Sequence, residues 1–142
     1  MRKRAAVWTG ALKNLSEQKK PGGLTDKDML TMIEKYNYTG EDFKVVMQFE
    51  GWKIGFLRYS ERFSGFKVLE RHNKTDEAFV LLEGTAVLHT EDESLNMEKC
   101  TLYNIPKGVW HHITVSENAT VMVVENSNTS AENTDKKLRI ED

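Results

Sequence analysis

A single all-β domain is the fold class that the sequence predicts. From Phe43 onward, apolar and polar residues alternate with a period of two, which is the side-chain period of a β-strand. The apolar runs are short, and breaks rich in Gly or Asn separate them without helical patterns in between. Many short strands at this spacing are typical of a β-barrel or a β-sandwich, and 142 residues suit one domain with its own core.

The strands are predicted from this alternation in chain order. The first is expected at residues 43–49, where one face is apolar, and a turn at Glu50-Gly51 leads into the second, which begins at Trp52. Further strands are expected near residues 66–72, 77–83, 85–90, 94–97, 99–104, 110–115 and 119–125. Residues 41–126 are thereby assigned to the barrel.

One helix is predicted ahead of the barrel, within an N-terminal extension of residues 1–40. Thr25 is a suitable N-cap, Asp28 follows three residues later, and Thr39-Gly40 ends the segment. Its apolar side chains follow helical spacing at Met29, Met32, Ile33 and Tyr36. Because one face is apolar, we expect the helix to pack on the outside of the barrel or on a second subunit.

The C-terminal residues 127–142 form a polar, turn-prone tail. We interpret the tail as an exposed segment that adds a short edge strand or reaches a neighbouring subunit. A disordered tail is equally compatible with its composition. The chain shows no internal repeat, so we expect one structural domain.

Charge and composition exclude several classes of partner. A net charge of −2 gives no electrostatic reason to bind nucleic acid. No apolar run approaches the roughly 20 residues of a membrane helix, so no membrane contact is expected, and the chain does not open with the pattern of a secretion signal. Cys100 is the only cysteine, which rules out an internal disulfide and favours a reduced, cytoplasmic location.

Two polar blocks interrupt the strand pattern and carry the candidate chemistry. The first covers residues 70–77 and runs into an apolar strand that ends at Gly84, and the second covers residues 106–112. Glu70 and His72 are two positions apart, so both side chains leave the same face of one strand.

These blocks resemble the two signature motifs of the cupin superfamily. The first motif usually has two His separated by one residue, a Glu five positions after the second His and a Gly seven after that Glu; these positions hold Glu70, His72, Glu77 and Gly84. The second motif, Pro-x-Gly-x-x-His, is matched by Pro106, Gly108 and His111. The resemblance implies a small cupin barrel, a double-stranded β-helix or jelly roll, with a pocket at one mouth.

The resemblance also implies a metal site made of Glu70, His72, Glu77 and His111. We expect Glu77 to begin the strand that pairs with the strand of His72, and His111 to come from a third strand. Imidazole and carboxylate ligands together suit Zn, Mn, Fe or Ni. His112 follows His111 directly and points to the opposite face, where we expect it behind the ligands or at an interface.

Glu70 is the main departure from the motif, because a His is usual at its position. Two interpretations are open. Either the carboxylate of Glu70 is a ligand, or it pairs with Arg71, Lys44 or Arg58 and no metal binds.

A narrower resemblance links the chain to the ureidoglycolate lyase group, which splits ureidoglycolate into glyoxylate and urea. It rests on residues 70–72, Ala78-Phe79 and residues 108–112. It implies elimination at a carbinol carbon, with His72 or His111 as the general base. Arg71 is expected to point outward, so Arg58 or Lys44 would be the partner of the substrate carboxylate.

From these motifs we therefore expect a small-molecule cupin that is a divalent-metal-dependent enzyme and acts on a small polar or carboxylated metabolite. His72 and His111 are its candidate catalytic residues. The alternative is a non-catalytic cupin that binds or senses a sugar or small acid. Cupin barrels commonly pair through sheet edges and terminal strands, so a homodimer is expected.

Overall fold

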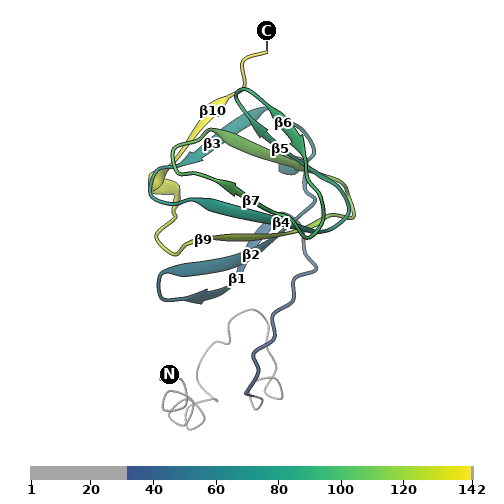
Figure 1. Cartoon of the computed structure of the whole chain (residues 1–142), viewed down its shortest axis with the longest axis vertical. Helices are drawn as coiled ribbons and strands as arrows, with labels where there is room; N and C mark the ends of the chain where they lie inside the picture. Colours follow the sequence, from purple (N-terminus) through teal and green to yellow (C-terminus); the bar gives the residue numbers. More distant parts are fainter. Residues whose placement is uncertain (1–31, 142) are drawn as a thin grey trace. The chain divides into compact units, whose positions relative to one another are not determined.

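The computed structural model describes residues 32–141, and the part beginning at Tyr38 forms a barrel of β-strands (Figure 1). The strands are β1 (Phe43–Phe49), β2 (Trp52–Arg58), β3 (Val68–His72), β4 (Glu77–Glu83), β5 (Ala86–Thr90), β6 (Ser94–Asn96), β7 (Leu102–Ile105), β8 (His111–Val115), β9 (Thr120–Asn126) and β10 (Thr134–Leu138). Two short 3-10 helices, η3 (Glu61–Phe63) and η4 (Ala131–Asn133), lie in the connections.

The strands form two five-stranded sheets. Sheet A has the order β1-β2-β9-β4-β7, and sheet B has the order β10-β3-β8-β5-β6. All pairs of named strands are antiparallel, so consecutive strands are joined either by short hairpins or by crossings from one sheet to the other. This arrangement confirms the all-β prediction.

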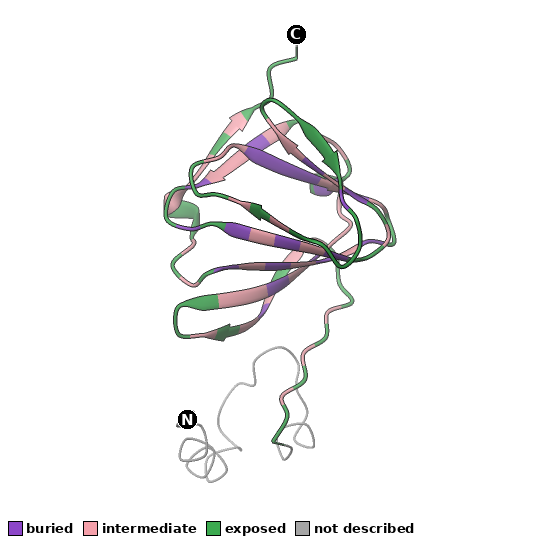
Figure 2. Ribbon diagram, in the orientation of Figure 1, coloured by how far each residue is buried: buried purple, intermediate pink, exposed green. Residues whose placement is uncertain are grey.

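The core lies between the two sheets, and most of its buried strand residues belong to β4, β5, β8 and β9 (Figure 2). The largest fully buried side chains all belong to sheet A: Phe79, Leu81, Val121 and Val123. Sheet B contributes Leu88 and Ile113 to the same cluster. Burial on alternate positions, as along β9, is what the period-two sequence pattern predicts.

One strand pairing predicted from the sequence is wrong. Glu77 begins β4, but β4 pairs with β7 and β9 in sheet A, whereas β3, which carries His72, belongs to sheet B. The connection at residues 73–76 therefore crosses from one sheet to the other. The crossing places His72 and Glu77 on facing sheets, so that both side chains point into the space between them.

The structure tests the predictions for the two ends of the chain to different extents. The predicted N-terminal helix lies largely outside the described residues, and its described part, residues 32–39, is not helical. At the other end, residues 134–138 form β10, which pairs with β3 along the edge of sheet B. Of the two interpretations of the tail, the edge strand is the one seen in the structure.

Within the described residues, no helix has the length and apolar character needed to cross a membrane.

Gly84, the last residue of the first motif, has a conformation that explains its identity. Its φ is +72°, a backbone region that residues with a Cβ seldom adopt. A Cβ at this position would lie 2.7 Å from both the Ala119 Cα and the Ser116 Oγ. The turn between β4 and β5 therefore needs a glycine for two independent reasons.

We expect Gly84→Ala to lower the free energy of unfolding by about 2–4 kcal/mol, because backbone strain and steric overlap add. Urea unfolding followed by circular dichroism measures this change. Gly51→Ala is the matched control, since an added Cβ at Gly51 would have nothing within 4 Å. Equal stability of the two variants would contradict this account of the turn.

Candidate metal centre

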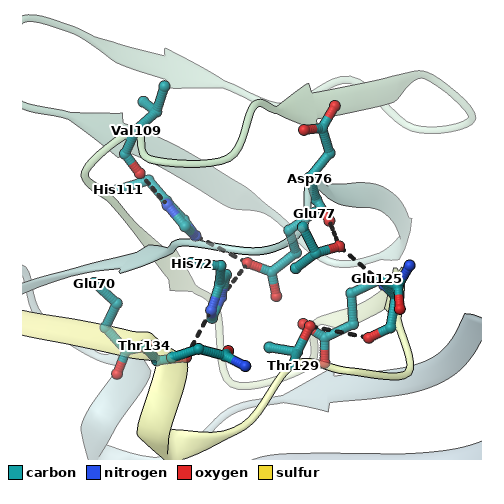
Figure 3. Close-up of polar contacts among 12 residues, drawn as sticks. Glu70, His72, Asp76, Glu77, Val109, His111, Glu125, Thr129 and Thr134 are labelled. Atoms are coloured by element: carbon teal, nitrogen blue, oxygen red, sulfur yellow. Dashed lines mark hydrogen bonds and ion pairs between the residues drawn. The ribbon is translucent and has the colours of Figure 1, made fainter.

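Three side chains meet between the sheets at one end of the barrel. His72 ends β3 and His111 begins β8, both in sheet B, and Glu77 begins β4 in sheet A. The Nε2 atom of each His lies 2.9 Å from Oε2 of Glu77. The potential ligand atoms of the three residues all lie within 4.8 Å of one another (Figure 3). Each of the three residues is at most 9% exposed.

Hydrogen bonds on the far side of each imidazole fix its orientation. The Thr134 hydroxyl donates to the Ser130 carbonyl, so its oxygen accepts from Nδ1 of His72 at 2.9 Å. The Val109 carbonyl accepts from Nδ1 of His111, also at 2.9 Å. Because Nδ1 carries the proton in both rings, Nε2 is the nitrogen left to act as a ligand.

This arrangement needs positive charge at its centre. Two neutral imidazoles with protonated Nδ1 atoms would present two Nε2 lone pairs to a carboxylate, which is repulsive at 2.9 Å. Either protons on the imidazoles or a bound cation removes the repulsion. Two imidazole nitrogens and a carboxylate oxygen, each oriented from behind, are a donor set that suits a divalent transition metal.

The loops of the two motifs hold each other in place. The Gly108 N–H donates to the His72 carbonyl at 2.7 Å, and the Lys107 N–H donates to the Asp76 carboxylate at 2.9 Å. Gly108 has a φ of +81°, a conformation that explains the glycine of the second motif. These bonds join the loop before Glu77 to the loop before His111, and so fix the distance between the two side chains.

Burial and hydrogen bonds act on Glu77 in opposite directions. Burial alone would raise its pKa, but the hydrogen bonds from His111 and His72 prevail and lower the pKa from 4.5 to about 2. For His72, burial alone would lower the pKa, and the hydrogen bond and charge of Glu77 raise it. The buried carboxylate is therefore ionised at neutral pH and favours positive charge beside it.

Glu70 lies outside the group of three. It faces the same cavity from β3, but its carboxylate is bound by Lys136 at 2.8 Å and by Arg62 at 3.1 Å. The cations that pair with it are thus neither Lys44 nor Arg58 nor Arg71. Its part in metal binding remains a prediction.

The cations suggested as partners of a substrate carboxylate lie elsewhere. Arg58 donates to the Thr120 hydroxyl, and Lys44 lies over the ring of Tyr38. Arg71 stacks on Trp110 and pairs with Asp135. None of these three cations lines the cavity, where the lysines and arginines of the described part of the chain are Lys53, Arg62 and Lys136.

A second buried carboxylate, Glu125, belongs to the cavity and was not identified from the sequence. Glu125 is the register partner of Glu77 on β9, so both side chains leave the same face of sheet A. Lys53 lies 3.4 Å from it, yet burial and the charge of Glu77 raise its pKa. The alternation Val121, Val123, Glu125 was the signal that places it inward.

His112 lies on the face of β8 opposite to His111. It is buried, its Nε2 donates to the Gly65 carbonyl at 2.9 Å, and its ring stacks on Phe63 and Phe66. Burial among these neighbours is the main cause that lowers the pKa of His112. His112 therefore packs the connection before β3 against the barrel.

No protein-family model and no curated protein sequence matches the chain. Solved structures do match. A cupin-2 domain protein from Shewanella frigidimarina NCIMB 400 superposes with a TM-score of 0.52 at 22% identity, over 63% of this chain and 84% of that one. The chain has a cupin fold.

Two further cupin-fold neighbours carry names of their own. Pac13 from Streptomyces, a nucleoside dehydratase solved with uridine, has a TM-score of 0.58 at 12% identity, over 77% of this chain and 95% of that one. KdgF from Halomonas sp. has a TM-score of 0.51 at 13% identity, over 61% and 80% of the respective chains. At these identities the likeness is one of fold.

The pKa of Glu77 predicts how the stability of the metal-free protein depends on pH. A carboxyl with a pKa of about 2 when folded and 4.5 otherwise stabilises the fold above pH 4.5, and this contribution is lost as the pH falls toward 2. Between about pH 5 and pH 3, we expect the wild type to lose about 2 kcal/mol more unfolding free energy than Glu77→Gln. Urea unfolding at both pH values measures the difference.

The matched control for this comparison is Glu83→Gln, a change at the exposed C-terminal end of the same strand. This variant should follow the wild type at both pH values. A Glu77→Gln variant that loses as much stability as the wild type would show that Glu77 is not the group whose protonation matters.

Proposed function

We propose that this cupin is a divalent-metal-dependent enzyme that acts on a small polar or carboxylated metabolite at the mouth of its barrel. His72, Glu77 and His111 hold the metal. The observation that carries the proposal is the orientation of the two imidazoles, whose Nε2 atoms both point at one carboxylate oxygen while their Nδ1 atoms donate elsewhere.

The cavity around this group limits the size of the substrate. Its volume is about 230 Å³, which is below the range of roughly 300–1,000 Å³ typical of sites for drug-sized ligands. Its lining includes apolar side chains, such as Phe43, Leu57 and Phe79, as well as charged ones. These features favour a metabolite of a few carbons with a charged or polar end.

A bound divalent metal would act as a Lewis acid and lower the pKa of a substrate hydroxyl or a water. The chain's own residues orient the site: Thr134 and Val109 hold the imidazoles, and Glu77 keeps the centre anionic. Without a metal, His72 and His111 beside Glu77 are the candidate acid–base groups. Elimination at a carbinol carbon, as in the ureidoglycolate lyase group, is the finer form of the proposal.

We expect the purified wild type, prepared without chelator, to contain close to one divalent metal per chain, and His72→Ala/His111→Ala to contain none. The double variant removes two of the three donors, which leaves one carboxylate. Elemental mass spectrometry of untagged protein measures the content. His89→Ala is the control, because His89 bonds to Ser94 and Thr114, away from the site.

Absence of metal in the wild type, with no uptake of Mn, Fe, Ni or Zn, would refute the metalloenzyme and favour a metal-free lyase or a binding module. The same measurement addresses Glu70. If Glu70 is the fourth ligand, Glu70→Gln takes up metal more weakly than the wild type. Unchanged uptake removes Glu70 from the ligand set.

Turnover separates an enzyme from a binding module. We expect the metal-loaded wild type to convert at least one member of a panel of small hydroxy acids and amides, followed by NMR, and His111→Ala to lose this conversion while keeping its circular dichroism spectrum. Thermal stabilisation by a panel member without product would instead favour the sensing cupin.

Two further parts of the proposal concern assembly and location. The homodimer expected from the sequence is tested by light scattering coupled to gel filtration, and a monomer at micromolar concentration would refute it. The cytoplasmic location likewise stays a prediction.

A further inference from the structure

We propose that Arg62 and Lys136 form the binding site for a carboxylate of the substrate, and that the carboxylate of Glu70 occupies this site until the substrate displaces it. The inference rests on the proposed function, because it specifies the class of molecule that enters the same cavity. It also replaces Arg58 and Lys44, which do not line the cavity, as the partners of that carboxylate.

The cluster at the mouth is assembled from three elements. Glu70 on β3 and Lys136 on β10 are register partners in sheet B, and Arg62 lies in η3. Lys136 Nζ lies 2.8 Å from Oε1 of Glu70, and Arg62 Nη2 donates to Oε1 and Oε2 at 3.1 and 3.3 Å. All three side chains line the cavity that also contains the His72–Glu77–His111 group.

The carboxylate is the enclosed member of this cluster, and the two cations are the open ones. The side chain of Glu70 is 17% exposed, whereas those of Arg62 and Lys136 are 47% and 60% exposed. A guanidinium has five N–H donors and an ammonium has three. The cations can therefore receive a second carboxylate from the solvent side before the first one leaves.

A substrate carboxylate matches Glu70 in charge and in shape. Glu70 is held as a carboxylate by its salt bridges with Lys136 at 2.8 Å and with Arg62 at 3.1 Å. Exchange of one carboxylate for another leaves the charge beside the cations unchanged. A neutral sugar carries no charge to replace that of Glu70, so its hydroxyls would gain hydrogen bonds from the cations but no ion pair.

The distance between the two parts of the cavity fixes the size of the acid. Glu70 and His72 are neighbours on one face of β3, so their backbones are about 6.6 Å apart along the strand. A molecule that reaches both the cation pair and the His72–Glu77–His111 group is therefore a short carboxylic acid whose reacting group lies a few bonds from its carboxylate.

A purely structural role for the cluster makes a different prediction. Arg62 also pairs with Asp42 at 3.3 Å, and Lys136 on the edge strand β10 pairs with Glu70 on β3. The cluster could therefore serve only to stabilise the segments around the mouth. In that case, removal of either cation changes stability but leaves the affinity for carboxylates unchanged. Affinity, measured apart from stability, distinguishes the two roles.

The test is an NMR titration of the full-length, ¹⁵N-labelled protein with glycolate, and separately with inorganic phosphate, in zinc-loaded and in chelator-treated samples. Because a charge-assisted hydrogen bond is lost in each case, we expect Arg62→Gln and Lys136→Gln to weaken glycolate binding about tenfold. Glu70→Gln should strengthen it, since the competing anion is gone. Arg62→Lys keeps the charge and should fall between.

Lys99→Gln, which removes an exposed lysine outside the cavity, is the matched control and should bind like the wild type. Circular dichroism confirms that each variant is folded. Unchanged glycolate affinity in both cation variants, or weaker binding by Glu70→Gln, would overturn the inference, and so would a preference for phosphate over glycolate. The chelator-treated samples separate the test of the anion site from the test of the metal centre. If glycolate affinity in these samples depends on Arg62 and Lys136, the anion site is supported even if no metal binds.

Discussion

The contact between the Glu77 carboxylate and the two imidazoles is the interaction on which the site depends. It joins the two sheets, because Glu77 belongs to sheet A and both His residues belong to sheet B. A buried carboxylate is costly unless it is paired and hydrogen-bonded. The requirement for positive charge beside Glu77 therefore governs both the geometry of the mouth and its chemistry.

Two layers of charge follow from this centre. The inner layer is anionic and contains Glu77, which contacts His72 and His111, and Glu125, which pairs with Lys53 at 3.4 Å. The outer layer balances the carboxylate of Glu70 with Arg62 and Lys136. A metal cation would balance the anionic inner layer, and the carboxylate of a bound acid would pair with the cations of the outer layer.

The fold was predictable because the period-two pattern is local. Every strand expected from residue 43 to residue 125 is present, with ends that move by a few residues. The pairing of strands was less predictable, because a four-residue connection can form either a hairpin within one sheet or a crossing between two. β3 and β4 are adjacent in sequence but lie in different sheets. The helix expected near Met32 and Tyr36 is not helical in its described part, because apolar residues at helical spacing do not by themselves form a stable helix.

The sequence by itself determined the strands, the glycines at Gly84 and Gly108, and the residue types at His72, Glu77 and His111, because each depends on local geometry or motif spacing. The tertiary structure decided which side chains meet. It brought Arg62, Lys136 and Glu125 into the cavity, from η3, β10 and β9, and left Arg58 and Lys44 outside. Contacts between residues far apart in the chain depend on how the sheets close, and no local pattern encodes that closure.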